Sequence, residues 1–254
     1  TPISQGAITV DVASNVAQDI ATNGNSAAAQ FSIIYDNIQP NVSLSSTASA
    51  DTNISPIPVT ITFTESVTNF VVGDLSPTNA TLSNFSGSGT TYTVDLVPSS
   101  EGTVSLDVPA GVAEDSSSNT NTASTTLSRN YDTSGPTTTI TSSLSGTTGA
   151  NPIPVTITFS EDVTSFTQSD IAVSNATISS FTATSSSVYD IVLSPSSDGL
   201  ITLNIAGGVA MDTATNGNLV ASQFSITSDR TQPDITLSDC VTECFHPTLR
   251  RLSK

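Results

Sequence analysis

Two sets of acidic and amide side chains in this sequence could bind a divalent cation. Each set combines an aspartate followed three or four residues later by proline, a glutamate after the motif Thr-Phe-Thr or Thr-Phe-Ser, and an Asp-x-x-x-Asn-x-Asn loop. Carboxylate and amide oxygens are the ligands that Ca²⁺ prefers, with six to eight around the ion. The candidate ligands are Asp36, Glu65, Asp115, Asn119 and Asn121 in the first set, and Asp132, Glu161, Asp162, Asp212, Asn216 and Asn218 in the second.

The segment that ends in each glutamate is nearly the same in both sets. Pro56-Ile-Pro-Val-Thr-Ile-Thr-Phe-Thr-Glu65 recurs 96 residues later as Pro152-Ile-Pro-Val-Thr-Ile-Thr-Phe-Ser-Glu161. Apolar and polar residues alternate with a period of two, which is typical of a β-strand with one buried and one wet face. Recurrence at a fixed spacing predicts a tandem array of repeats.

The other motifs place the repeat boundaries. Ile8-Thr-Val-Asp-Val12 matches Val104–Val108 and Ile201–Ile205, and the Asp-x-x-x-Asn-x-Asn loop follows all three segments. We therefore expect residues 1–37 to be the C-terminal part of a truncated repeat. Residues 38–133 and 134–230 are predicted to be complete repeats, and residues 231–254 the start of a further repeat followed by a divergent tail.

Alternation and turn residues predict seven short strands in each complete repeat. Seven such strands in about 100 residues favour an all-β fold of tandem immunoglobulin-like, seven-stranded antiparallel sandwiches. A fibronectin-like or cadherin-like variant would give the same pattern. In the first repeat the strands are expected near 41–45, 57–64, 68–72, 79–85, 90–97, 102–109 and 124–131, with Val42, Leu44, Val59, Ile61, Phe63, Phe70, Phe85, Tyr92, Val94, Leu96, Val104, Leu106, Val108, Leu127 and Tyr131 inside.

The order of the strands predicts that the candidate ligands meet. Successive strands run up and down, so the loops after the second and sixth strands lie at the pole where the chain enters the sandwich. The aspartate that ends the preceding repeat arrives at the same pole. Several carboxylates gathered there repel one another unless a cation neutralises them. The hypothesis is a structural Ca²⁺ site at each junction between repeats, which stiffens the array.

The alternative to a metal site is that these residues only form turns. Asp and Asn bond their own backbone and tolerate left-handed conformations. Asp74 and Asp170 belong to this class, because they follow the third strand and are expected to cap a turn there.

Composition excludes several functions. The chain of 254 residues carries 22 acidic and five basic residues, a net charge of −17, which should repel nucleic acid and anionic membranes and attract cations. No apolar run is long enough to span a bilayer, so no membrane insertion is expected. The only histidine, His246, lies outside the repeats, so a Ser-His-Asp triad is excluded and we expect no enzyme. The lack of an initiator Met suggests a piece of something longer.

Residues after Asp239 match nothing earlier in the chain. Cys240, Cys244 and His246 give three soft ligands without a fourth, so a stray tail or a chance disulfide is favoured over a metal site.

The complete repeats, with Pro-Val-Thr-Ile-Thr-Phe-Thr/Ser-Glu, Asn-Ala-Thr-Leu/Ile-Ser-x-Phe and Asp-x-x-x-Asn-x-Asn in this order, resemble the bacterial Ig-like repeats of large secreted surface proteins and adhesins. The resemblance covers residues 1 to about 238. It implies stalk or spacer sandwiches of extracellular, cell-surface adhesion and biofilm proteins, commonly with calcium at the junctions. The linker aspartate, the strand-two glutamate and the loop aspartate would be the matching ligands.

Two functions from different classes follow. The first is a stalk whose partners are the neighbouring repeats of the same chain. The second is a binding module that holds cell-surface glycans, ice or other copies of itself through loops or through outward threonines such as Thr60, Thr62, Thr156 and Thr158. Similarity of the two repeats at surface and core alike favours the stalk, because a binding site usually distinguishes one repeat from its neighbours.

Overall fold

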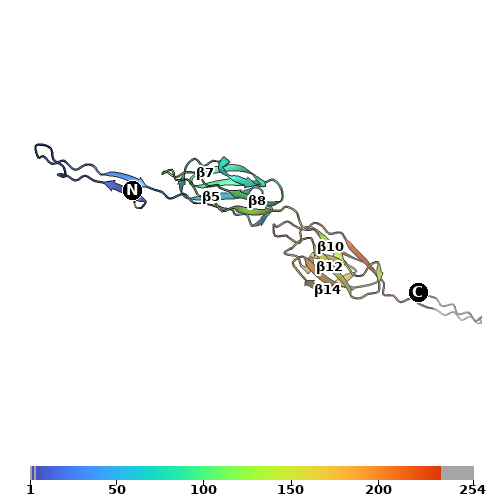
Figure 1. Ribbon diagram of the computed structural model, residues 1–254. Helices are drawn as coiled ribbons and strands as arrows, with labels where there is room; N and C mark the ends of the chain where they lie inside the picture. Colours follow the sequence, from blue (N-terminus) through green and yellow to red (C-terminus); the bar gives the residue numbers. More distant parts are fainter. Residues whose placement is uncertain (1, 3, 236–254) are drawn as a thin grey trace, which may run out of the picture. The chain divides into compact units, whose positions relative to one another are not determined.

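The computed structural model describes residue 2 and residues 4–235 (Figure 1). Cys240, Cys244 and His246 of the divergent tail lie outside the described residues. The chain divides into two compact units. Unit 1 combines the residues up to Thr138 with Phe159–Phe166 and Ala206–Val220, and the other residues form unit 2. Unit 1 therefore holds the first complete repeat together with the start of the second repeat and two of its loops.

The first repeat consists of two sheets. One has the order β3 (Val42–Ser45), β5 (Ile57–Val67) and β7 (Ala80–Pro98). The other has the order β4 (Asp51–Thr52), β9 (Leu127–Tyr131), β8 (Gly102–Asp107) and β6 (Ser76–Thr78). The all-β fold class is confirmed.

The core of the first repeat lies between these sheets. Val59 and Ile61 on β5, and Val104 and Leu106 on β8, are at most 2% exposed and belong to one apolar cluster. Threonines alternate with the buried residues on β5, so the period of two in the sequence is the period of burial. Leu44, Phe85 and Tyr131 were expected inside but are only partly buried at the margin of this cluster.

The second repeat has the same two-sheet topology. Its first sheet has the order β10 (Thr138–Thr141), β12 (Ile153–Phe159), β15 (Val188–Pro195) and β14 (Ala176–Ala183). Its second has the order β11 (Thr147–Thr148), β17 (Phe224–Ser228), β16 (Gly199–Ile205) and β13 (Ile171–Ser174). Ile153, Leu193, Ile201 and Leu203 are fully buried.

The N-terminal segment is a hairpin with an uncovered apolar face. β1 (Gly6–Val10) pairs antiparallel with β2 (Phe31–Tyr35), as the matching strands β8 and β9 pair in the first repeat. Val10 and Phe31 are 56% and 59% exposed, whereas Leu106, at the position of Val10, is fully buried. A hairpin of two strands cannot bury a core by itself.

Two details differ from the expected strands. Residues 68–72 form no strand; the chain makes a short 3₁₀ turn, η1 (Val72–Asp74), and the strand that follows is β6. The Asp74 carboxylate accepts a hydrogen bond from Val71 N at 2.7 Å, which confirms its expected role in a turn. Asp170 caps η2 (Gln168–Asp170) in the same way.

None of the helices in the described residues is long and apolar enough to cross a membrane.

The expected strands 79–85 and 90–97 are the two arms of a hairpin that together make up the element β7. The chain turns back between them at Gly87 and Gly89, which both have positive φ. Ser99 N donates to Asn79 O at 2.9 Å and Asn84 Nδ2 donates to Asp95 Oδ2 at 2.8 Å, contacts that require this reversal. The expected sheets were purely antiparallel, but β4 pairs with β9 in parallel, and β11 pairs with β17 likewise. The short β4 and β11 lie in the segments before β5 and β12, where alternation is too brief to indicate a strand.

Candidate metal centre

The Asp-x-x-x-Asn-x-Asn loop of the first repeat is built from its own side chains. The Asp115 carboxylate accepts hydrogen bonds from Ser117 N at 2.7 Å, from Asn119 N at 2.9 Å and from Asn119 Nδ2 at 2.9 Å. Ser118 adopts a left-handed conformation with φ 67° to close the turn. Asp115 is only 5% exposed, so the loop holds a nearly buried carboxylate in one orientation.

The Asn121 side chain holds the backbone of this loop through hydrogen bonds. Its Oδ1 accepts hydrogen bonds from Val112 N and Ala113 N, both at 2.9 Å, and its Nδ2 donates to Pro109 O and Thr122 O. The side chain is 1% exposed. Because both polar groups of Asn121 are used by the backbone, we assign it a structural role in place of the expected ligand role. Asn218 makes the equivalent four hydrogen bonds in the second repeat and is assigned the same role.

A backbone bridge brings the end of β5 beside the loop. Thr68 N donates to Glu114 O at 2.7 Å, and Glu114 N donates back to Thr68 O at 3.2 Å. Glu65 lies three residues before this bridge and Asp115 one residue after Glu114. The strand-two glutamate and the loop aspartate are therefore placed side by side by β-type pairing.

Asp36 completes the first group of carboxylates. Asn119 Nδ2 donates to Asp36 O at 3.2 Å, which ties the linker to the loop. One carboxylate oxygen from each of Asp36, Glu65 and Asp115 lies within 4.8 Å of the other two. Two oxygens bound to one Ca²⁺ at roughly 2.4 Å each are separated by no more than about 4.8 Å. The donor set and spacing therefore fit a calcium ion.

The second repeat contains the same arrangement in residues of unit 1. Asp132, Glu161 and Asp212 each offer an oxygen within 4.8 Å of the others. Asn216 N and Nδ2 donate to the Asp212 carboxylate, and Nδ2 also donates to Asp132 O at 2.9 Å. The bridge between the strand end and the loop is repeated by Thr164 and Met211.

The electrostatics of both groups are unfavourable for the free carboxylates. Burial, followed by the charges of Asp115 and Asp36, raises the pKa of Glu65. Burial, followed by the charges of Asp212 and Asp132, likewise raises the pKa of Glu161. A bound cation would reverse this effect, because it favours the charged form.

Asp115 behaves differently from its neighbours in the group. Burial acts to raise its pKa, but the hydrogen bonds from Asn119 and from the backbone N–H of Ser117 outweigh burial and lower the pKa. The loop aspartate therefore stays ionised, which is the state that a metal ligand needs.

The remaining expected ligands stand outside these two groups. Asp162 is exposed and is not one of the grouped carboxylates of the described residues. Asn119 and Asn216 lie beside the groups but donate their Nδ2 hydrogens to carboxyl and carbonyl oxygens, so they hold the ligands in place. Asn216 Oδ1 accepts a hydrogen bond from Asn53 Nδ2 at 3.0 Å. Sequence reasoning missed Asn53, because Gly149 stands at the matching position of the second repeat.

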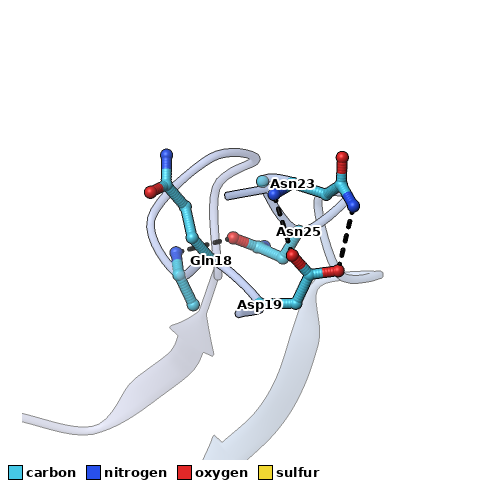
Figure 2. Close-up of a pocket in the computed structure, with 6 residues that line it drawn as sticks. Gln18, Asp19, Asn23 and Asn25 are labelled. Atoms are coloured by element: carbon cyan, nitrogen blue, oxygen red, sulfur yellow. Dashed lines mark hydrogen bonds between the residues drawn. The ribbon is translucent and has the colours of Figure 1, made fainter. Parts of the chain in front are cut away.

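The truncated repeat preserves the loop without the rest of the group. Figure 2 shows Asp19 accepting hydrogen bonds from Asn23 N and Nδ2, with Asn25 beneath the loop as Asn121 is in the first repeat. These residues line an open pocket, together with Ala17, Gln18 and Gly24. The pKa of Asp19 is lowered by its hydrogen bonds to the Asn23 side chain and backbone. The loop is thus a local structure, whereas the group of three carboxylates needs three separate segments.

Tandem sandwiches with a repeated carboxylate group at the start of each complete repeat define a class of modular β-protein, in which similar domains follow one another along one chain. The model of the bacterial Ig-like domain family matches residues 36–131 and 132–228. The chain belongs to this family. The two matched copies begin at Asp36 and Asp132, the linker aspartates of the two groups.

Solved structures that match the chain include three bacterial proteins. The Escherichia coli adhesin FdeC is 15% identical with a TM-score of 0.42, and the match covers 84% of this chain and 70% of FdeC. Invasin, a bacterial integrin-binding protein, is 12% identical with a TM-score of 0.41 over 90% of this chain and 46% of invasin. The Yersinia pseudotuberculosis adhesin InvE is 14% identical with a TM-score of 0.28 over 75% of this chain and 58% of InvE. Comparison with curated protein sequences gave no match.

Proposed function

We propose that this chain is a run of stalk or spacer repeats from an extracellular bacterial surface protein or adhesin, and that calcium at the start of each complete repeat stiffens the array. The observation that carries the proposal is the repetition of one group of three carboxylates, Asp36 with Glu65 and Asp115, and again in the second repeat. Membership of the bacterial Ig-like family and the tandem arrangement support the spacer role.

Each group draws its carboxylates from three separate segments of the chain. In the second group Asp132 comes from the linker between repeats, Glu161 from the end of the second strand, and Asp212 from the Asp-x-x-x-Asn-x-Asn loop. Asp132 N also donates to Thr52 O of the first repeat at 3.0 Å. An ion held by all three carboxylates would therefore fix the linker to the repeat that follows.

The energetic case rests on charge. Without a cation the three carboxylates repel one another, and this adds to the repulsion within a chain of net charge −17. With Ca²⁺ bound the same charges stabilise the folded junction, because the ion binds the folded state and not the unfolded chain. Calcium at millimolar extracellular concentration suits sites with dissociation constants of roughly 10⁻⁴ to 10⁻³ M.

The test is calorimetric titration of the full chain with Ca²⁺ after treatment with a chelator. Two binding events are expected, one of which is lost in Glu65→Gln and the other in Glu161→Gln. Small-angle scattering with and without Ca²⁺ then reports stiffening as a narrower distribution of conformations. The proposal fails if the wild-type chain takes up no Ca²⁺ at 10 mM, or if both single variants bind two ions.

A further inference from the structure

The turn between β7 and β8 carries a carboxylate that holds the linker to the next repeat. Glu101 Oε1 accepts hydrogen bonds from Thr133 N at 3.0 Å, from Thr133 Oγ1 at 2.6 Å and from Ser134 Oγ at 2.9 Å. Ser134 Oγ also lies 3.0 Å from Glu101 Oε2. These hydrogen bonds, donated by Thr133 first and Ser134 next, lower the pKa of Glu101. We call this arrangement the linker clamp.

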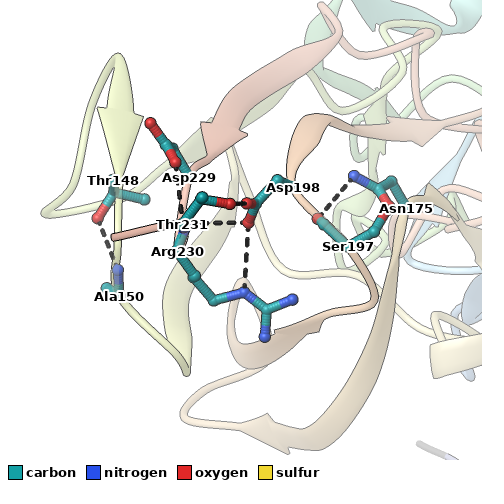
Figure 3. A network of polar contacts seen from close by, with 8 residues as sticks. All are labelled: Thr148, Ala150, Asn175, Ser197, Asp198, Asp229, Arg230 and Thr231. Atoms are coloured by element: carbon teal, nitrogen blue, oxygen red, sulfur yellow. Dashed lines mark hydrogen bonds and ion pairs between the residues drawn. The ribbon is translucent and has the colours of Figure 1, made fainter. Parts of the chain in front are cut away.

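The second repeat has a linker clamp made of different residues (Figure 3). Asp198 accepts hydrogen bonds from Arg230 N at 2.8 Å and from Thr231 Oγ1, and it forms an ion pair with Arg230 Nε at 3.7 Å. Asp198 and Glu101 occupy the same position of the repeat, before Gly199 and Gly102 respectively. Both glycines have positive φ, 127° and 103°, and such a turn favours glycine. A carboxylate therefore accepts the hydrogen bonds in both repeats, although the linker residues that donate them differ.

The linker clamp lies directly beside a carboxylate of the second group. Thr133 and Ser134 follow Asp132, whose Oδ1 accepts a hydrogen bond from Ser134 N at 2.9 Å. On its other side Asp132 N is bonded to Thr52 O. The backbone of Asp132 is therefore fixed to the first repeat at both ends before any ion binds.

We propose that Glu101 is a positioning residue for the calcium site formed by Asp132, Glu161 and Asp212. This inference rests on the proposed function, since it requires that Asp132 is a metal ligand. Glu101 does not touch the site; it acts through the backbone of Thr133 and Ser134. Residues that orient metal ligands typically change metal affinity by about 10- to 100-fold when they are mutated.

The first group offers a natural comparison, because the residues of the linker clamp are replaced there. Gln5 stands at the position of Glu101, and Asn37 and Ile38 stand at the positions of Thr133 and Ser134. A neutral amide replaces the carboxylate and an isoleucine replaces a hydroxyl donor. Asp36 accepts a hydrogen bond from Ile38 N at its Oδ1, at 3.0 Å, which is the counterpart of the bond from Ser134 N to Asp132. The first site is therefore expected to bind Ca²⁺ more weakly than the second.

The experiment isolates each site in the full chain and measures Ca²⁺ affinity by calorimetry. In a Glu65→Gln background, which leaves only the second site, Glu101→Gln should weaken Ca²⁺ binding about tenfold. In a Glu161→Gln background, which leaves only the first site, Glu101→Gln should have no effect. Asp198→Asn is the matched control, because it removes the other linker clamp, and it should leave both affinities unchanged.

Two further measurements separate positioning from folding. The melting temperature in chelator should be nearly the same with and without Glu101→Gln, because an exposed clamp contributes little to global stability. If Glu101→Gln fails to fold, Ser134→Ala removes one hydroxyl donor and keeps the carboxylate, and it should weaken the second site about two- to threefold.

The outcomes distinguish this inference from the proposed function. Uptake of no Ca²⁺ by the wild-type chain refutes both. Normal uptake by the wild-type chain with unchanged affinity in Glu101→Gln refutes only the positioning role of Glu101. An equal loss of affinity at both sites would also overturn it, because the linker clamp adjoins only the second group.

Discussion

Replacement of Glu161 by glutamine separates the two effects that a carboxylate has in the second group. Glutamine keeps the size of the side chain and removes its charge. Without calcium the variant loses the cost of burying a charged carboxylate and the repulsion from Asp212 and Asp132, which together raise the pKa of Glu161, so it should be at least as stable as the wild type. With calcium it lacks one of three charged ligands, so it should be less stable than the wild type. The sign of the change in stability is therefore expected to reverse with calcium.

The size of the calcium effect follows from linkage. At a free Ca²⁺ concentration 100 times the dissociation constant, binding to the folded state adds about 2.7 kcal/mol to the free energy of unfolding. For a repeat of this size that corresponds to roughly 10–20 °C in melting temperature. If the loss of one charged ligand weakens binding about 100-fold, only about 0.4 kcal/mol remains at the same concentration.

Differential scanning calorimetry of the full chain measures the melting temperatures of the wild type and of Glu161→Gln, each in 10 mM Ca²⁺ and in chelator. Glu65→Gln is the matched control, since it makes the same change in the first group. Asp162→Asn is the neutral control, because Asp162 is exposed and stands apart from the grouped carboxylates. The reasoning is refuted if Glu161→Gln lowers the melting temperature equally in chelator and in calcium, since the glutamate would then be structural.

Three other outcomes are expected. In chelator, the free energy of unfolding should fall as the pH rises from about 4.5 through the raised pKa values of Glu65 and Glu161, because a carboxyl with a raised folded pKa stabilises the fold only while protonated. Denaturant titrations of the double glutamine variant should show a flatter pH dependence, and an unchanged slope would contradict this expectation. Asn121→Ala should destabilise the first repeat by about 2–4 kcal/mol in urea unfolding, because two buried N–H groups lose their acceptor; Asn25→Ala, its counterpart in the exposed hairpin, should leave that transition unchanged. Ile61→Ala should cost about 2–5 kcal/mol in the same assay, because its side chain is fully buried, and a loss below 1 kcal/mol would place it outside the core.

Much of the fold was predictable because burial follows a period of two. Val59, Ile61 and Phe63 alternate with polar residues, and all three are at most 2% exposed. Ile57 has the same phase in this alternation and is also fully buried, although it was not among the expected core residues. Phe85 was placed inside by its phase but lies on the first arm of the β7 hairpin, where it stacks on Tyr92 of the second arm at 5.8 Å near the edge of the core. Periodicity reports the face of a strand, and does not report how far the other sheet extends over it.

The meeting of the carboxylates was predictable from strand order alone, because order decides which loops share a pole. Asp36, Glu65 and Asp115 do lie together; that they bind calcium stays a prediction. The distinction between ligands and supports was not predictable. Asn119 and Asn121 are both asparagines and lie two residues apart in the motif. Asn119 donates to a carboxylate, whereas Asn121 forms hydrogen bonds with four backbone groups. Only hydrogen-bond partners separate these roles.

The truncated hairpin shows which part of the candidate site is local. In its loop Asp19, Asn23 and Asn25 reproduce the hydrogen bonds of Asp115, Asn119 and Asn121, although β1 and β2 leave their apolar face exposed. The loop therefore keeps its hydrogen bonds without a covering sandwich, and it supplies one oriented carboxylate. A strand-end glutamate reaches that carboxylate only when its own repeat has folded, and the linker aspartate is supplied by the segment before the repeat, which for the first group is only the truncated hairpin. Under the proposed function, calcium affinity at the second group would depend on the folding of its own repeat and on the position of Asp132, which hydrogen bonds to Glu101 and Thr52 of the first repeat hold.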